Sequence, residues 1–356
     1  MGLFSRFKKT ESTSKNKRSA ELTVLTNEKL TADSCQISFT IPAELKADFQ
    51  YIPGQYLNLH CIINNETVVR SYSICSGTNE ALAVAVKRIP TGKASNWIFN
   101  ELVAGSTILV DFPQGNFQVG DTEKSIVAFA AGSGITPILS MAKSLNETKI
   151  KLFYGNSAPE SAMFLSDLTA LSTVELFPFY TKSTIEGAGF GRFNKEVVTE
   201  IVKADLSILN ADGYYLCGPE EMIVHVNEVL TTFGVPKEKI HFELFTTPVL
   251  LVEKETSKTE QFSGTSQVTA MLDGEVVKIE LSGTGKSILD ALDQAGMDVP
   301  FSCKGGVCCT CKAKIIEGSA AMNINYALTD DEVANGYILT CQAHPTSAVL
   351  KIDYDV

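Results

Sequence analysis

The sequence predicts a multidomain chain with three architectures: an antiparallel β-barrel, an α/β domain on a parallel sheet, and a smaller α+β domain. Three observations lead to this fold class. Short strand-like runs fill residues 20–120, and buried strands alternate with helices over 121–246. A polar segment, 247–263, is then expected to be a linker before a last domain at 264–356. At roughly 150 residues per domain, 356 residues allow two or three cores.

The composition narrows the class of protein. Lys and Arg number 30 against 41 Asp and Glu, so the net charge is −11, which argues against a nucleic-acid partner. No apolar run is long enough to span a membrane, and the start lacks a secretory signal. We therefore expect a cytoplasmic protein without stable membrane insertion. Residues 1–19 are polar and basic and are expected to form a disordered tail.

The first domain is expected to be a small barrel, because its strand-like runs are punctuated by turns such as Pro53–Gly54. The expected strands are 35–41, 56–61, 68–74, 82–88 and 107–112, with a helix at 94–102.

Two tetrapeptides of this domain could bind a nucleotide. Arg70-Ser71-Tyr72-Ser73 ends a strand, and Gly92-Lys93-Ala94-Ser95 opens the helix. An arginine fork can pair with a pyrophosphate, a tyrosine ring can stack on a flat heterocycle, and a helix N-terminus attracts phosphate. Taken alone, each match is weak, and ordinary strand residues are the alternative.

The second domain is expected to contain a parallel sheet covered on both faces. Its expected strands are 125–131, 151–154, 174–180 and 213–217, and its expected helices lie at 138–145, 161–171, 195–202 and 220–233. The first strand is followed by the turn Gly132-Ser133-Gly134-Ile135-Thr136-Pro137, where such sheets bind nucleotide phosphates. Cys217-Gly218-Pro219 follows a later strand at the same sheet edge; a buried structural thiol is the alternative for Cys217.

The third domain has few expected strands and one main helix, at 287–295, after a hairpin at Asp273–Gly274. Cys303-x4-Cys308-x2-Cys311, then 29 residues, then Cys341 is the plant-type [2Fe–2S] spacing. A zinc ribbon needs two Cys-x-x-Cys knuckles, a thioredoxin-like pair leaves two cysteines unexplained, and Rieske ligation needs two histidines. The iron–sulfur interpretation is therefore favoured, with Cys309 expected to be a non-ligand.

Residues 20–246 resemble the ferredoxin–NADP reductase superfamily, because four short motifs occur there in that superfamily's order. These motifs are Arg-x-Tyr-Ser, Gly-x-x-Ser, Gly-x-Gly-x-x-Pro and Cys-Gly-Pro. The resemblance implies bound FAD, with Arg70 on the pyrophosphate, Tyr72 stacked on the isoalloxazine and Ser73 facing N5. It implies that Ser73 and Cys217 are catalytic, that the last domain is a β-grasp ferredoxin, and that a closing segment, 241–245, covers the flavin with an aromatic residue. The expected cofactor-binding residues are Arg70, Ser71, Tyr72, Ser73, Val86, Lys87, Gly92, Lys93, Ala94, Ser95, Gly132, Ser133, Gly134, Thr136, Thr181, Lys182, Cys217, Gly218, Pro219 and Phe245; the expected metal ligands are Cys303, Cys308, Cys311 and Cys341.

The nicotinamide nucleotide is expected to be NADPH or NADH. Thr181-Lys182 stands where the superfamily places a 2′-phosphate-binding pair, which favours NADPH. Asn156-Ser157 lacks the arginine that some relatives carry, which favours NADH.

The order of flavin, nucleotide and ferredoxin domains resembles the reductase components of multicomponent oxygenases. The expected activity is that of an NAD(P)H:acceptor oxidoreductase, because a flavin can join two-electron hydride transfer to a one-electron cluster. The expected partner is an oxygenase, and the nearest match is to reductases of phenylacetyl-CoA epoxidase systems, which serve a di-iron oxygenase in phenylacetate catabolism. A Rieske oxygenase, a hybrid-cluster protein or a free carrier are alternative acceptors, and a non-catalytic redox sensor is a less favoured alternative.

Overall fold

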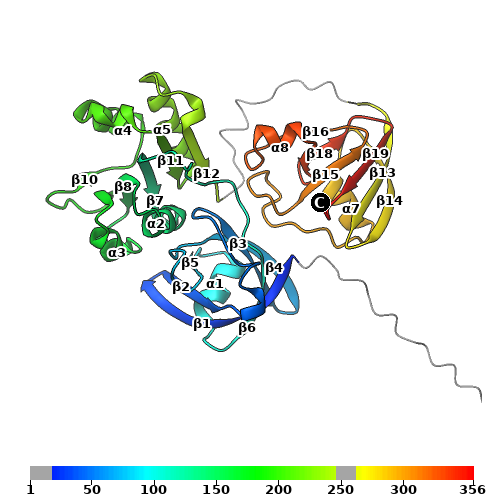
Figure 1. The fold of residues 1–356 in the computed structure, drawn as a ribbon, viewed down its shortest axis with the longest axis horizontal. Helices are drawn as coiled ribbons and strands as arrows, with labels where there is room; N and C mark the ends of the chain where they lie inside the picture. The colour runs from blue at the N-terminus through cyan, green and yellow to red at the C-terminus, as the bar shows by residue number, and fades with distance from the viewer. Residues whose placement is uncertain (1–17, 246–261) are drawn as a thin grey trace, which may run out of the picture.

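The computed structural model describes residues 18–245 and 262–356, which form three domains around separate sheets (Figure 1). The expected linker lies almost wholly outside the described residues, as does the expected tail, although Ser19 already belongs to the first strand. Within the described part of the chain, no helix is long and apolar enough to cross a membrane.

The first domain is an antiparallel barrel with strand order β4-β3-β6-β1-β2-β5. A bridge between Ile74 and Val84 joins the two outer strands and closes it. The strand β1, 13 residues long, is an element that the sequence pattern did not predict. The elements are β1 (Ser19–Thr31), β2 (Ser34–Thr40), β3 (Tyr56–Ile63), β4 (Glu66–Ser73), β5 (Ala83–Lys87), α1 (Lys93–Asn100) and β6 (Thr107–Asp111).

The second domain is a six-stranded parallel sheet with the order β10-β9-β8-β7-β11-β12. Its strands bury alternate residues on opposite faces, under α2 and α3 on one side and α4 and α5 on the other. The elements are β7 (Ser125–Ala131), α2 (Ile135–Ser144), β8 (Lys149–Asn156), α3 (Leu165–Ala170), β9 (Val174–Tyr180), β10 (Gly189–Phe190), α4 (Lys195–Ala204), β11 (Gly213–Cys217), α5 (Glu220–Thr232) and β12 (Ile240–Glu243).

The expected helix at 161–171 is wrong in its first half. A 3-10 turn covers Pro159–Ser161, and Phe164 has a left-handed backbone with φ of 58° before α3 begins. The chain leaves helical geometry because Ala162, Met163 and Phe164 turn inward and are buried against β7 and β8. Burial of these side chains overrides the local helical pattern.

The third domain is a mixed five-stranded sheet of order β14-β13-β19-β15-β17 with a small β16-β18 ladder, so the expectation of few strands is wrong. Asp273 and Gly274 have positive φ values of 52° and 77°, as the predicted two-residue hairpin requires. The elements are β13 (Thr265–Leu272), β14 (Glu275–Ser282), α7 (Ile288–Gln294), β15 (Lys312–Glu317), β16 (Ala320–Met322), α8 (Asp330–Ala334), β17 (Tyr337–Leu339), β18 (Ala343–Pro345) and β19 (Val349–Asp353).

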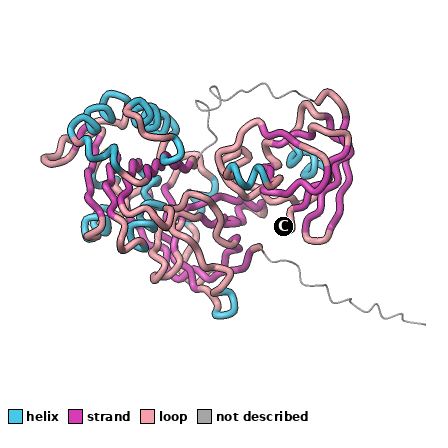
Figure 2. The backbone as a smooth tube through the Cα atoms, turned by 45° about the horizontal axis from the view of Figure 1, so that its top comes forward, coloured by secondary structure: helices cyan, strands magenta, loops and turns pink. Residues whose placement is uncertain are grey.

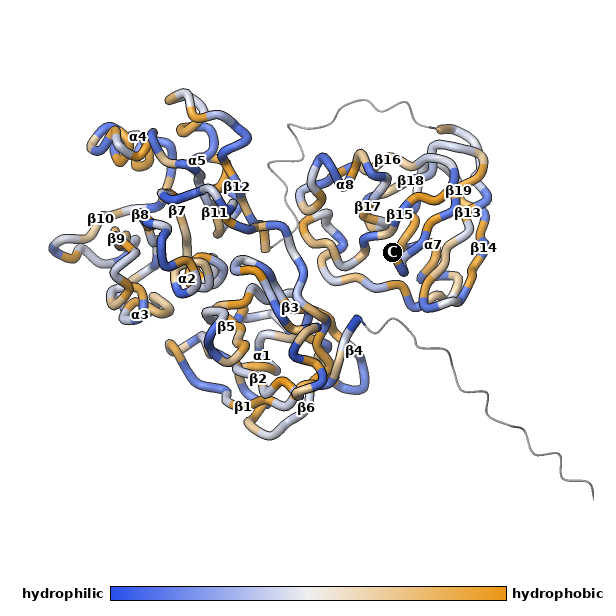
Figure 3. The backbone as a smooth tube through the Cα atoms, in the orientation of Figure 1, coloured by the Kyte–Doolittle hydropathy of each residue, from blue (hydrophilic) through white to orange (hydrophobic). Residues whose placement is uncertain are grey.

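The barrel lies below the other two domains in Figure 1 and contacts both. Helices are concentrated in the second domain, whereas strands dominate the other two (Figure 2). Hydrophobic segments run along the sheets of all three domains, in keeping with a core in each and one on either face of the second sheet (Figure 3). The multidomain fold expected from the sequence is confirmed.

Candidate functional site

The carboxyl ends of three parallel strands meet at one edge of the second sheet. Cys217, which ends β11, pairs in register with Ala130 of β7 on one side and Glu243 of β12 on the other. After β7, a 3-10 turn over Gly132–Gly134 leads into α2. This edge is where parallel sheets receive nucleotides, and the helix N-terminus favours a phosphate.

The turn needs glycine for steric reasons. A Cβ on Gly134 would lie 2.0 Å from the carbonyl oxygen of Cys217, and Gly132 has φ of 55°. The two turns predicted from sequence, 132–137 and 217–219, are thus packed backbone to backbone. Pro219 is the N-cap residue of α5, so a second helix begins beside the first.

Ser73 and Glu243 form a hydrogen-bonded pair between the barrel and the second sheet. Ser73 Oγ donates to Glu243 Oε2 at 2.9 Å. Burial raises the pKa of Glu243 to about 7, while the bond from Ser73 opposes this rise. Burial also raises the pKa of Cys217, with Glu243 adding to the effect. Near neutral pH, Glu243 can therefore hold or release a proton beside Ser73.

A pocket beside this pair is lined from all three domains. Arg70, Ser71 and Ser73 of β4 face Glu243 and Phe245, and the third domain adds Ser302, Cys303 and Cys308. Phe245 is 44% exposed, as an aromatic residue that covers a ligand would be. Tyr72 packs against the barrel core rather than lining this pocket. A flavin lying here would therefore adjoin both the hydride-donor edge and the cysteine-rich loop.

Other predicted FAD-binding residues lie around the barrel end. The side chain of Val86 is buried in the barrel core, so only its backbone could contact a ligand. Lys87 lies 3.7 Å from Asp33, and a Cβ built on Gly132 would approach Lys87 Nζ to 4.0 Å. Gly92 is the N-cap of α1 and has no side-chain cap bond, while Lys93, Ala94 and Ser95 form the first turn of that helix. The structure places these residues near one another but not in the pocket itself.

The predicted 2′-phosphate site lies at the ends of β8 and β9. The backbone N–H groups of Thr181 and Lys182 donate to the carbonyls of Asn156 and Ser157 at 3.1 and 2.9 Å. These bonds hold Thr181 and Ser157 side by side, and the Lys182 side chain is exposed to solvent. Two hydroxyls and a lysine are suited to a phosphate group.

The four predicted metal-ligating cysteines converge. Cys303 Sγ lies 3.2 Å from Cys308 Sγ, and Cys341 shares hydrogen bonds with Cys303 and Cys311. Hydrogen bonds from Cys308 and Cys341 hold the pKa of Cys303 well below its usual range, and the same contacts raise the pKa values of Cys308 and Cys341. The sulfurs thus lie close enough to share protons, as the ligands of one metal site must. Cys309 Sγ instead lies 3.5 Å from the carbonyl oxygen of Ala327.

The surroundings of these sulfurs fit an iron–sulfur cluster. The backbone N–H of Gly305 donates to Cys303 Sγ at 3.3 Å, which is the kind of bond that stabilises a cluster ligand. Gly306 has φ of 73°, and a Cβ there would lie 3.0 Å from the carbonyl of Ile324. Four thiols, a tight glycine turn and N–H donors are the donor set of a plant-type [2Fe–2S] site.

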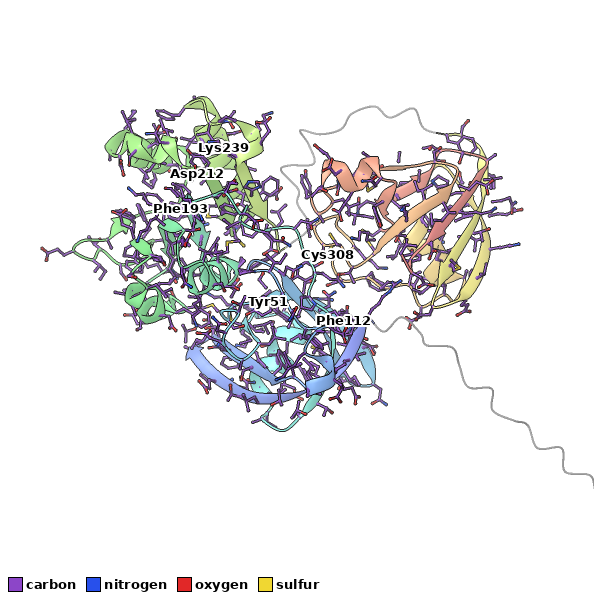
Figure 4. All side chains as sticks on the ribbon, viewed as in Figure 1. Tyr51, Phe112, Phe193, Asp212, Lys239 and Cys308 are labelled. Atoms are coloured by element: carbon purple, nitrogen blue, oxygen red, sulfur yellow. The ribbon has the colours of Figure 1, made fainter. Side chains whose placement is uncertain are left out.

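The cysteine-rich loop is docked on the barrel through β3. The backbone N–H of Cys309 donates to the phenol oxygen of Tyr56 at 2.9 Å, and Asn58 Nδ2 donates to Thr310 Oγ1 at 3.0 Å. In Figure 4, Cys308 lies on the side of the third domain that faces the other two. Sequence reasoning missed Tyr56, Asn58 and Glu243; only Glu243 lies within a segment that the resemblance singles out.

A nucleotide-binding sheet edge, a pocket shared with a barrel, and four converging thiols define a flavin- and iron–sulfur-dependent reductase. Family models agree: an oxidoreductase FAD-binding domain matches residues 21–119, an oxidoreductase NAD-binding domain matches 129–228, and a 2Fe-2S iron-sulfur cluster binding domain matches 270–346. The chain belongs to the family of ferredoxin-reductase-type oxidoreductases that includes the reductase components of oxygenases.

Curated relatives match almost the whole chain. It is 35% identical to a component of the 1,2-phenylacetyl-CoA epoxidase of Escherichia coli (strain K12), over 94% of this chain and 97% of that protein. It is 33% identical to the ferredoxin reductase component of 3-ketosteroid-9-alpha-monooxygenase from Rhodococcus rhodochrous, over 95% of this chain and 97% of that protein. Among solved structures, phthalate dioxygenase reductase is similar with a TM-score of 0.57 and 25% identity, over 94% of this chain and 98% of that one.

Proposed function

We propose that this chain takes electrons from NADPH and delivers them to a di-iron oxygenase that epoxidises phenylacetyl-CoA. The observation that carries the proposal is the 35% identity to the E. coli epoxidase component, which spans 97% of that protein. The pocket that joins Ser73 and Glu243 to Cys303 and Cys308 supports the electron route. FAD bound there supplies the conversion from hydride transfer to single-electron transfer.

The chain's own side chains bind and orient the groups. Arg70 and the α1 N-terminus would hold the flavin phosphates, and Ser73, which donates to Glu243, would face the ring. Tyr72 packs on the barrel core and would meet the ring from the barrel side. The turns at Gly132–Gly134 and at Cys217 position the nicotinamide nucleotide. The four cysteines at 303, 308, 311 and 341 would hold the cluster, and Phe245 would shield a bound flavin from water.

NADPH is favoured by the exposed Lys182 and by the hydroxyls of Ser157 and Thr181, which backbone bonds bring to neighbouring strand ends. None of the nine cysteines forms a disulfide, which agrees with a reducing compartment, and we infer that the protein is cytoplasmic.

An oxygenase of another kind is the second candidate acceptor, because the relatives include a 3-ketosteroid-9-alpha-monooxygenase reductase component at 33% identity. Reconstitution separates the two. The reductase is mixed with the purified oxygenase components of a phenylacetyl-CoA epoxidase, or with a 3-ketosteroid monooxygenase, and NADPH consumption is compared with product formed. Coupled epoxidation of phenylacetyl-CoA supports the proposal, and turnover with the steroid oxygenase alone would refute it.

A further inference from the structure

We propose that Asn58 of the barrel is a positioning residue that directs the hydroxyl of Thr310 onto the sulfur of Cys308 when the two domains are docked, and so raises the reduction potential of the cluster. The inference rests on the proposed function in one respect, the assignment of Cys308 as a cluster ligand.

The side-chain amide of Asn58 is fully buried, with 0% exposure, and has partners on both atoms. Its Nδ2 lies 3.0 Å from Asp111 Oδ2, and its Oδ1 accepts from Ser71 Oγ at 2.7 Å. Because a carboxylate oxygen only accepts, the amide atom that faces Asp111 must be the nitrogen. Asp111 is held in turn by His60 Nε2 at 2.7 Å. The same nitrogen therefore also donates to Thr310 Oγ1.

The Thr310 hydroxyl has two acceptor positions and one hydrogen. Asn58 occupies the first acceptor position. Tyr56, which accepts the N–H of Cys309, also lies beside Thr310. Because Asn58 donates to Thr310, the hydrogen of Thr310 stays available for another acceptor, and Cys308 Sγ lies within hydrogen-bond distance at 3.3 Å. A ligating sulfur is a thiolate and can only accept this bond.

A hydrogen bond to a ligand sulfur stabilises the more negative, reduced cluster and raises its potential. Asn58 lies on β3 and is 252 residues away in the chain from the threonine that it meets. The bond is thus fully aligned only while the barrel and the loop are docked. By linkage, reduction must strengthen docking by the same factor. On separation, the reduced cluster becomes the stronger reductant for an acceptor.

The test is a redox titration of the cluster, followed by its EPR signal, in the full-length holoprotein. Asn58→Ala and Thr310→Val should each lower the potential, by up to about 59 mV for a tenfold change in a one-electron equilibrium. The double variant should lie no lower than Thr310→Val alone, because Asn58 acts through Thr310. Thr310→Ser keeps the hydroxyl and should stay near the wild type.

Asn116→Ala is the matched control, since this exposed residue also crosses the interface, to Ala327 and Glu332, but does not reach a cysteine. If Asn58→Ala does not fold, the contrast between Thr310→Val and Thr310→Ser still tests the bond to Cys308, because only the serine variant keeps the hydroxyl. An unchanged potential in these variants, additive losses in the double variant, or an equal shift in Asn116→Ala would overturn the proposal. Iron content per chain tests the ligand assignment separately.

Discussion

Gly134 lies at the sheet edge proposed to bind the nucleotide, where it packs against the backbone of Cys217. In Gly134→Ala, the new Cβ would meet the Cys217 carbonyl at 2.0 Å, so one of the two turns must move. We expect the KM for NADPH to rise by about fivefold or more, since overpacking of this kind costs about 1–3 kcal/mol. Steady-state ferricyanide reduction measures it.

Gly120→Ala is the control for this variant, because its Cβ would meet only the flexible carboxyl of Glu123 at 3.1 Å. An unchanged KM in Gly134→Ala would contradict a turn packed this closely.

Glu243 should make stability depend on pH. Its pKa is raised from 4.5 to about 7 by burial, so between these values the folded state binds more protons than the unfolded state. The free energy of unfolding therefore falls as pH rises through this window, by at most about 3 kcal/mol. Glu243→Gln should lose this pH dependence. Its melting temperature should therefore rise relative to that of the wild type as the pH is raised from 5 to 8, as thermal unfolding can measure.

The exposed Glu238→Gln variant should follow the wild type across the same pH range. If the stability of Glu243→Gln also follows that of the wild type, the Glu243 carboxyl is not buried as described.

At the residue scale, motif spacing located most of the candidate site. Ser73, Gly134, Cys217 and the four cysteines could be named from sequence because glycine turns and cysteine spacing carry local signals. Glu243 could not, because its partner Ser73 is 170 residues away in the chain.

At the scale of elements, the ends of β8 and β9 are expected to select the nucleotide. Lys182→Ala should raise the KM for NADPH about tenfold, or about 1.4 kcal/mol, and leave that for NADH nearly unchanged, because only NADPH carries the 2′-phosphate. Parallel kinetics with the two nucleotides measure the ratio, with the exposed Lys203→Ala in α4 as control. An equal rise for both nucleotides would count against this site.

Most strands and helices could be predicted because their periodicity agrees with their burial. The strand β1 was missed because exposed and buried residues mix over its length, and bulges interrupt its pairing with β2. The region before α3 was misassigned because the inward turn of Met163 is decided by packing on β7 and β8, which no local pattern reports.

At the scale of the whole molecule, the three domains should act as separable modules. Cys341→Ala should lose the cluster absorbance yet still reduce ferricyanide through the flavin, because no residue of the flavin pocket is changed. Absorbance spectra and ferricyanide kinetics on the same preparation measure both properties. The buried non-ligand variant Cys309→Ala should keep its cluster. Loss of both properties in Cys341→Ala would contradict a modular chain.

The order of domains was predictable, but their docking was not. The contacts of Tyr56 and Asn58 with the cysteine-rich loop join segments more than 250 residues apart, and neither residue belongs to a motif. Such contacts depend on how two folded surfaces meet, so they emerge only from the assembled structure.

Electrons from a nicotinamide nucleotide are expected to reach the cluster through the flavin. Anaerobic addition of NADPH, followed by the flavin absorbance and the cluster EPR signal together, tests it most directly. We expect the flavin to bleach first and the reduced-cluster signal to follow in the same chain, with NADPH acting faster than NADH. A flavin that bleaches fully while the cluster stays oxidised would contradict the claim.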